Sequence, residues 1–333
     1  MVTEPLKGAK FVVIGGGTGS FTLLSGLKHY VRDITALVNM ADDGGSTGQL
    51  RDELGVLPPG DIRQCLVALS DTPKIRDLFN YRFEEGSLAG HAFGNLFLTA
   101  LEKMTGDFSE AVELAGEVLH ITGRVEPVTT TSVTLCAEGI DGADIRGEYE
   151  IGHTVLAEHP KVWLEPEAKA NPAAVQAIKD ADLVVIAPGN LYGSLAPALV
   201  VPGIAKALRE TKARCVYVAN LVTKPGPTQH YKVHDFADEI ERFAGQKFLD
   251  AVIYNTDHPS EALMKKYAHE GEYAVEVDVE ENKKRQWLAR GLPILAHTAV
   301  EQGSKSDPLA ATRSLIRHNP DIIARQLMRL YFV

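Results

Sequence analysis

The sequence predicts an α/β protein with a mainly parallel sheet. Short apolar runs, typical of buried parallel strands, recur at 11–14, 181–187, 215–219 and 250–254. Each run ends in glycine, asparagine or hydroxyl residues, and segments with helical apolar spacing lie between the runs. Ligands of open α/β sheets bind at the carboxyl ends of the strands, so the residues just after these runs are the first candidates for a binding site.

The first strand, turn and helix are expected within residues 10–27. Phe11–Ile14 is interpreted as a buried strand that stops at glycines, and leucines at 23, 24 and 27 place one apolar face of the next segment against the sheet. Unpaired N–H groups and the dipole at the start of such a helix favour an anion, and glycine lets a phosphate approach closely. The alternative is a tight turn without a ligand. The predicted phosphate contacts are Gly15, Gly16, Gly17, Thr18, Gly19 and Ser20.

A second strand, Asp33–Val38, runs into an acidic and glycine-rich segment at 39–48, which we expect to be a loop facing the same crevice. Its carboxylates could accept hydrogen bonds from sugar hydroxyls, or hold Mg²⁺ together with phosphate oxygens. A surface turn is the alternative interpretation. The candidate residues are Asp42, Asp43, Gly44, Gly45 and Ser46, with Asp42 and Asp43 as candidate Mg²⁺ ligands.

Two later segments have the pattern of helix starts. Prolines precede Asp61 in the segment 58–63, so this acid could be an N-cap or a partner of the helix dipole as well as a ligand contact. The segment 90–98 opens a further helix. His91 and Asn95 are four residues apart and would project from one face if both are helical.

The sequence pattern changes at about 119–164, where apolar residues are spread among threonines, glycines and charged residues. We expect short antiparallel strands here, with a hairpin turn at Asp141-Gly142 and strand surface at 129–131. This segment is too short for much core of its own, so we interpret 1–333 as one domain with a β-rich insertion. Further expectations are helices at 171–178 and 202–211, a last strand at 273–279, and a closing helix at 313–330 interrupted near 319–320.

Composition narrows the class of protein. With 333 residues, 45% of them hydrophobic, the chain can bury a full core, while the net charge of −10 and the absence of a long basic block argue against a nucleic-acid partner. Three widely spaced cysteines without CxxC spacing, Cys65, Cys136 and Cys215, indicate a reducing compartment and no structural zinc site. Neither a signal-peptide core nor an apolar stretch of about 18 residues is evident, so we expect a cytoplasmic protein without membrane insertion.

Seven motifs, in this order along the chain, resemble the YvcK-like gluconeogenesis factors, a group related to the CofD phospholactyl transferases. They are GGGTGS at 15–20, ADDGGSTG at 41–48, PPGDIR at 58–63, GHAFGNL at 90–96, APGNLYGSL at 187–195, NLVTKPG at 220–226 and RHNP at 317–320. The resemblance implies a three-layer α/β/α, Rossmann-like (CofD-like) fold in a cytoplasmic bacterial protein. It also implies binding of nucleotide sugars of the UDP-N-acetylglucosamine type by a regulator that links carbon metabolism to cell-wall synthesis and cell shape.

The resemblance also assigns site residues. The segment 15–20 matches the phosphate turn, and Asp61 matches the acid that lies beside the acceptor in the transferase branch. Asp42 and Asp43 match the acidic pair, and His91 and Asn95 match a GHxxGN helix start. In the loop usually written GPGSLYTS the matching residues are Asn190, Leu191 and Ser194, with asparagine in place of serine at 190 and glycine in place of threonine at 193. In the loop usually written NxMTQ they are Asn220, Thr223 and Lys224, where Lys224 replaces a glutamine and either contacts phosphate or points to solvent.

These residues favour a binding and regulatory protein without turnover, because no nucleophile is evident beside a general base. The alternative is a Mg²⁺-dependent transferase of a phospholactyl-type group from a nucleotide diphosphate, with Asp42 and Asp43 on the metal and Asp61 at the acceptor hydroxyl. An NAD-binding dehydrogenase ranks last because it rests on the glycine turn alone. A nucleotide sugar is the expected ligand, Mg²⁺ is an open addition, and a homo-oligomer and a protein partner both stay open.

Overall fold

The computed structural model describes residues 4–226, 228–296 and 315–333. Its main sheet has the strand order β10-β9-β8-β7-β1-β2-β3, and every neighbouring pair is parallel. These strands are β1 (Leu6–Gly15), β2 (Val31–Val38), β3 (Arg124–Pro127), β7 (Leu183–Ile186), β8 (Arg214–Val218), β9 (Ala251–Asn255) and β10 (Leu288–Leu292). A small antiparallel sheet has the order β5 (Asp144–Arg146), β4 (Thr134–Glu138), β6 (Val162–Glu165).

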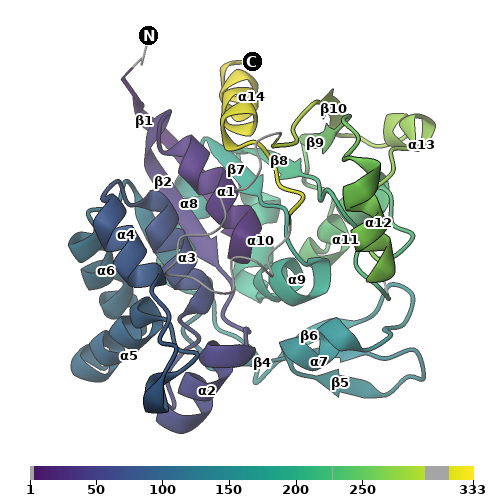
Figure 1. The fold of residues 1–333 in the computed structure, drawn as a ribbon. Helices are drawn as coiled ribbons and strands as arrows, with labels where there is room; N and C mark the ends of the chain where they lie inside the picture. Colours follow the sequence, from purple (N-terminus) through teal and green to yellow (C-terminus); the bar gives the residue numbers. More distant parts are fainter. Residues whose placement is uncertain (1–3, 227, 297–314) are drawn as a thin grey trace.

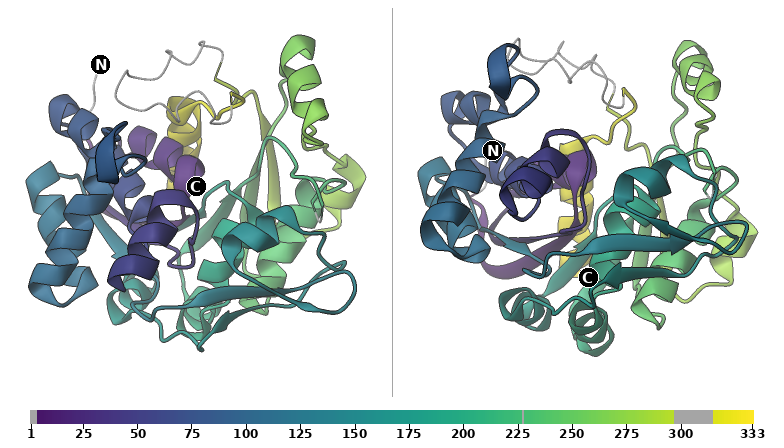
Figure 2. Two further views of the ribbon diagram at one scale, coloured as in Figure 1. Left: turned by 60° about the horizontal axis from the view of Figure 1, so that its bottom comes forward. Right: turned by 90° about the horizontal axis from the view of Figure 1, so that it is seen from below.

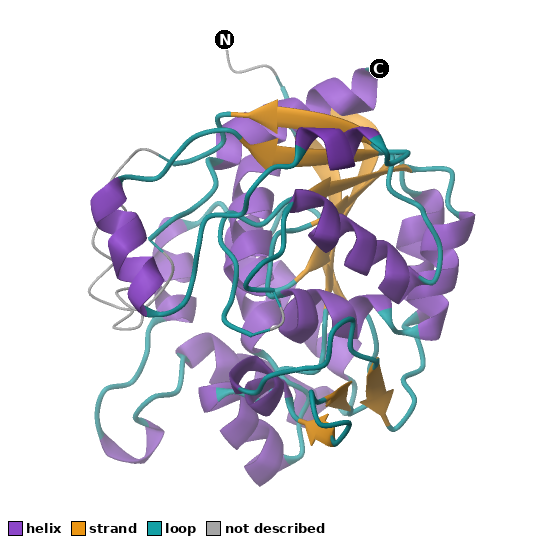
Figure 3. Ribbon diagram, turned by 90° about the vertical axis from the view of Figure 1, so that its right-hand side faces the viewer, coloured by secondary structure: helices purple, strands orange, loops and turns teal. Residues whose placement is uncertain are grey.

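Helices cover both faces of the main sheet, which makes three layers (Figures 1 and 3). The first face carries α1 (Gly17–Leu27), α3 (Gly60–Leu69), α5 (Phe93–Thr105), α6 (Phe108–Leu119), α12 (Glu261–His269) and α14 (Pro320–Phe332). The second carries α8 (Pro172–Asp180), α9 (Ala196–Leu199), α10 (Pro202–Glu210) and α11 (Val233–Ala244). The remaining helices are α2 (Gly45–Leu54), α4 (Pro73–Asn80), α7 (Glu148–His153) and α13 (Val279–Lys283), with a 3₁₀ turn at Gly86–Leu88 and a π-helical turn at Leu191–Leu195.

Strand β1, inside the main sheet, shows how the sequence builds these layers. Successive side chains of a strand point to opposite faces, and here Phe11 and Val13 enter one core while Val12 and Ile14 enter the other. All four are almost fully buried. Burial of one such side chain contributes about 1.5–3 kcal/mol, so the continuous apolar run stabilises both layers at once.

The strand order places a crevice beside the end of β1. Strand β1 pairs with β2 on one side and with β7 on the other, so the connections after β1 and β7 lead to opposite faces of the sheet. Open α/β sheets bind ligands at such a switch point, outside the carboxyl ends of the strands. In Figure 1 this edge faces downward, and Figure 2 shows α2 and the small sheet lying at it.

Several expected elements are corrected by the structure. Within 119–164 only β4, β5 and β6 are antiparallel, whereas β3 joins the main sheet and 148–153 is helical because an acidic first turn follows Gly147. The hairpin turn is confirmed, with Gly142 at φ +81° between β4 and β5. Residues 129–131 form a loop with a single bridge at Thr129, and the one-domain interpretation stays a prediction.

Two expectations near the chain's end are also wrong. Residues 273–278 are extended but form only isolated bridges, and the sheet instead ends with β10. The closing helix begins at Pro320, because Asn319 accepts hydrogen bonds from the first helical N–H groups. Residues 313 and 314 lie outside the described part.

The three cysteines are free and buried, as expected. Within the described ranges no single helix is long and apolar enough to cross a membrane, and residues 191–199 with 202–210 reach that length only as a pair bent by 75°.

Candidate functional site

The glycine turn after β1 is shaped by close contacts inside the protein. A Cβ atom on Gly16 would lie 2.0 Å from a carboxylate oxygen of Asp61, and one on Gly19 would lie 1.7 Å from the Pro188 carbonyl oxygen. These two glycines therefore let α3 and the loop after β7 approach α1. Gly17 differs, because it has φ +61° and a Cβ atom added to it would lie 3.8 Å from its nearest neighbour, a carboxylate oxygen of Asp61. It is the glycine of this turn with room beside it.

Other residues of the turn play mixed roles. A Cβ on Gly15 would lie 2.8 Å from the Ser20 hydroxyl oxygen, which is buried and has no hydrogen-bond partner within the described residues. Ser20 therefore faces the protein. Thr18 lies on the open side of α1, in a cavity described next.

A cavity of about 150 Å³ lies on one side of the turn, and we call its walls the cationic half of the crevice. Its walls are residues 18, 19 and 22 of α1, residues 188–190 after β7, residues 220–222 and Lys224 after β8, and residues 316–318 before α14. Lys224 and Arg317 bring positive charge, and no carboxylate lines the cavity among the residues that the structure describes. Burial lowers the pKa of His318 to about 4, so its imidazole is neutral at pH 7.

Two asparagines position the loops of the cationic half. The Asn220 side chain donates to the Gly189 carbonyl at 2.7 Å and accepts from the Gly189 N–H at 3.2 Å, which ties the two loops together. The Asn190 side chain accepts from the N–H groups of Tyr192 and Gly193 and so begins the π-helical turn. In this turn Leu191 is buried and the Ser194 N–H donates to the Asn190 carbonyl. The expected loop at 188–195 is thus partly helical.

In the loop after β8, the predicted contacts Thr223 and Lys224 face different parts of the protein. Thr223 is 2% exposed, and its hydroxyl accepts a hydrogen bond from the Tyr273 N–H at 3.1 Å. Its side chain therefore faces the segment at 273 rather than the cavity. Lys224 reaches the cavity mouth, where its ammonium forms an ion pair with Glu272.

Three carboxyl groups near the turn repel one another, and we call them the acidic half: Asp42, Asp61 and Glu148. Asp61 accepts a hydrogen bond from the Gly17 N–H, so it caps α1 from α3. Asp42 accepts from the Gly44 N–H at 3.0 Å, and Glu148 begins α7. The sequence pattern around 148 predicts short strands, so it does not single out Glu148 as a site residue.

Burial and mutual repulsion raise the pKa values in the acidic half. Burial raises the pKa of Asp61 to about 7, and repulsion from Asp42 and then Glu148 adds to the shift. Burial, followed by repulsion from Asp42 and Asp43, likewise raises the pKa of Glu148 to about 7. The pKa of Asp42 is also raised, chiefly by burial. Burial and then repulsion between like charges disfavour the ionised forms, so Asp61 and Glu148 hold their protons more tightly than exposed carboxyls do.

Asp43 turns away from the crevice. Its two carboxylate oxygens accept hydrogen bonds from the N–H groups of Glu148 and Tyr149, at 3.0 and 2.9 Å, so it caps α7. The pair Asp42 and Asp43 is therefore split between two tasks. Among the described residues, no group of three His, Cys, Asp or Glu side chains is arranged to hold a metal ion.

Ser46 connects three of the predicted motifs beside the acidic half. Helix α2 begins at Gly45, so the expected loop at 39–48 ends earlier than predicted. The Ser46 hydroxyl lies 2.9 Å from His91 Nδ1 and accepts from Asn95 at 3.4 Å. His91 precedes α5 and does not share a helix face with Asn95, yet both side chains converge on Ser46.

Arg63 supports this arrangement from the interior. It is 3% exposed, and its guanidinium donates to Asn95 at 2.9 Å and to Asn80 at 2.5 Å. Sequence reasoning noted Arg63 only as part of a helix start, although a charged residue inside a buried helix face is a signal for such a network.

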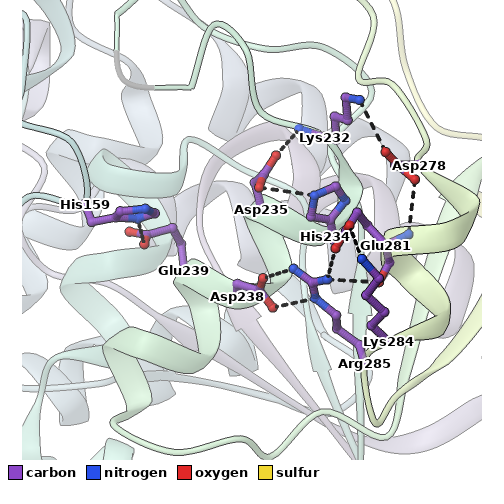
Figure 4. Close-up of polar contacts among 10 residues, drawn as sticks. All are labelled: His159, Lys232, His234, Asp235, Asp238, Glu239, Asp278, Glu281, Lys284 and Arg285. Carbon is purple, nitrogen blue, oxygen red and sulfur yellow. Dashed lines mark hydrogen bonds and ion pairs between the residues drawn. The ribbon is translucent and has the colours of Figure 1, made fainter.

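A second network holds the π-helical turn from behind. The Tyr192 hydroxyl lies 3.1 Å from the Tyr231 hydroxyl and donates to the buried carboxylate of Glu239 at 3.3 Å. Figure 4 shows His159 reaching the same carboxylate from the loop before β6. The turn that begins at Asn190 is thereby joined to α11.

Comparisons with known proteins agree along most of the chain. The family model of 2-phospho-L-lactate transferase CofD matches residues 11–293. A Bacillus subtilis protein described as a gluconeogenesis factor is 40% identical over 327 residues, covering 96% of this chain and 98% of that protein. A relative from Clostridium acetobutylicum is 46% identical over 284 residues, but these are 84% of this chain and only 63% of that protein. A solved Bacillus halodurans structure of the UPF0052 family is 35% identical, covers 97% of this chain and 99% of that one, and has a TM-score of 0.88.

Proposed function

The chain belongs to the gluconeogenesis-factor family and shares the CofD family model, and from this premise we propose that it binds a nucleotide sugar of the UDP-N-acetylglucosamine type. The ligand occupies the crevice between the cationic and acidic halves. In this proposal the protein is a cytoplasmic regulator that links carbon metabolism to cell-wall synthesis and cell shape.

The cationic half carries the proposal. Its cavity combines the first turn of α1 with Lys224 and Arg317, and no carboxylate lines it among the described residues. A protein with a net charge of −10 repels anions over most of its surface, so an anionic ligand needs a local site of this kind. Helix N-termini and cations together suit the diphosphate of a nucleotide sugar.

The acidic half suits the sugar. Carboxyl groups with pKa values near 7 can both accept and donate hydrogen bonds, and a sugar presents hydroxyls that do the same. Asp61 and Glu148 would therefore read hydroxyl positions. The side chains of both halves are carboxyls, amides, hydroxyls and cations, a set that supports recognition without turnover.

A transferase is the second candidate, and Asp61 is the observation that favours it. A partly buried carboxyl with a pKa of about 7 is poised to take a proton from an acceptor hydroxyl at neutral pH. Carboxylate oxygens such as those of Asp42 and Asp61 have the chemistry that Mg²⁺ prefers, and phosphate oxygens of the ligand would have to complete the donor set because no three side chains of the described residues form one. Asp43 is committed to α7, so the donor set differs from the expected pair.

Calorimetric titration with UDP-N-acetylglucosamine, UDP-glucose, UDP and GDP, each with and without Mg²⁺, tests the proposal. We expect saturable binding of the UDP-sugars without a need for Mg²⁺. In a separate thermal denaturation, a UDP-sugar at 100 times its Kd should stabilise the folded protein by about 2.7 kcal/mol and raise the melting temperature by about 4 °C. Binding of GDP that requires Mg²⁺ would favour the transferase. No binding of any UDP compound would refute the nucleotide-sugar proposal.

A further inference from the structure

The ion pair between Lys224 and Glu272 joins the cationic half to a segment that sequence reasoning had interpreted as the last strand. Lys224 has 55% of its side chain exposed at the cavity mouth, whereas the Glu272 side chain is only 9% exposed. A carboxylate that is so well buried depends on its partner, because an unpaired buried charge is costly. The two groups are therefore unequal, with a fixed anion and a cation that can reach solvent or ligand.

Residues 272–278, which we call the strap, hold Glu272 in place. Thr223 and Tyr273 exchange hydrogen bonds at 2.8 and 3.1 Å, and the Val275 N–H donates to the Leu221 carbonyl at 3.0 Å. The first half of the strap is thus bound to the loop that carries Lys224.

The far end of the strap is anchored separately. The Val233 N–H donates to the Glu276 carbonyl at 3.1 Å, and Asp278 forms an ion pair with Lys232 at 3.5 Å (Figure 4). Neither contact involves Lys224 or Glu272. The strap therefore keeps most of its contacts when the Glu272 charge is removed.

We propose that Glu272 is an internal competitor of the anionic ligand for Lys224 and thereby sets the charge that a ligand must carry to bind. This inference rests on the proposed nucleotide site. A phosphate group that approaches Lys224 meets an ammonium already paired with a carboxylate and also feels the repulsion of that carboxylate. Ligands with a diphosphate overcome this competition better than ligands with one phosphate.

The competition predicts that removal of the Glu272 charge strengthens ligand binding. Loss of a contact beside a binding site normally weakens binding. Glu272→Gln instead removes the competing charge, while its amide oxygen still accepts from Lys224. We expect about three- to fivefold tighter binding of UDP, the size expected for one charge near a partly exposed partner. The gain should be larger for UMP relative to its own weak starting affinity, because a singly phosphorylated ligand competes less well with Glu272.

Calorimetric titration of UDP and UMP into wild type, Glu272→Gln, Lys224→Gln and the double variant tests the proposal. Tighter binding by Glu272→Gln that disappears in the Lys224→Gln background would support it, since both effects pass through one ammonium. Asp278→Asn is the matched control, because it removes the charge at the far end of the strap and should leave both affinities unchanged.

The outcomes separate the inference from the function on which it rests. If wild type binds UDP but Glu272→Gln binds it equally or more weakly, Glu272 is only a structural anchor and the inference is wrong. A gain that persists in the double variant would also overturn it. If wild type and every variant fail to bind any UDP compound, the proposed function itself fails.

Discussion

The two halves of the crevice use opposite electrostatics within a few residues of one glycine turn. In the cationic half the polar side chains of Asn190 and Asn220 are satisfied by the protein itself, and Lys224 has a carboxylate partner. In the acidic half, Asp61 and Glu148 are crowded carboxyls whose pKa values are raised to about 7. The cationic half can therefore take an anion once Lys224 exchanges Glu272 for it. The acidic half is unfavourable until protons, hydroxyls or a cation join it.

We expect the largest effect from substitutions at Gly16 and Gly19, the two glycines that let α3 and the loop after β7 approach α1. Gly16→Ala and Gly19→Ala each place a methyl group within 2.0 Å of a fixed oxygen, so we expect a loss of about 3 kcal/mol in unfolding free energy. Thermal denaturation measures it. Gly152→Ala is the control, because Gly152 lies in α7 with nothing within 4 Å of its added Cβ, and it should be neutral or stabilising. Equal melting temperatures for wild type and Gly16→Ala would refute the close approach of Asp61.

Stability should depend on pH through the acidic half. The folded pKa of Asp61 is raised to about 7 against about 3.9 in the unfolded chain, so the folded state holds this proton more tightly. Its contribution is full below pH 4 and is lost as pH rises through 7. Between pH 5 and pH 8 we expect Asp61→Asn to gain about 1–3 kcal/mol of stability relative to wild type, and we expect the difference due to this proton to vanish only near pH 4.

Chemical denaturation of wild type and Asp61→Asn across this pH range checks the prediction. A constant difference between the two proteins from pH 5 to 8 would show that Asp61 is already ionised and that the acidic half is not crowded.

Loss of Lys224 should weaken binding in the cationic half. We expect Lys224→Gln to lower UDP affinity about tenfold, equivalent to about 1.4 kcal/mol, because one charge-assisted contact with phosphate is lost. Lys206→Gln, which removes an exposed lysine paired with Glu210, is the control. Unchanged UDP affinity in Lys224→Gln would move the diphosphate out of this cavity.

We expect the smallest effect from a substitution at Glu148, which tests whether the acidic half contacts the sugar and not the diphosphate. Glu148→Gln keeps a hydrogen-bonding group of similar shape, so we expect UDP to bind as in wild type and UDP-N-acetylglucosamine to bind about three- to fivefold more weakly. Titration of both ligands into this variant measures the ratio. A similar loss for both ligands would show that Glu148 does not read the sugar.

Local patterns predicted β1, β2, β7, β8 and β9 and the polar loops after them, because apolar runs and glycines report directly on the backbone. They missed β10 and the place of β3 in the main sheet. Contacts between distant elements were not accessible in the same way. Asp43 was expected in the crevice, but its partners are backbone N–H groups of α7, which come into reach only when the small sheet folds back. Glu272 had no local signal, since its role depends on the strap lying beside Lys224.

Hydrogen–deuterium exchange with and without saturating UDP-N-acetylglucosamine locates the ligand site on the chain. We expect slower exchange of backbone amides at 17–20, 188–190 and 220–224, with a smaller effect at 42–48. Protection confined to the amino edge of the sheet, or unchanged exchange in all four segments, would contradict the assignment of the crevice as the ligand site.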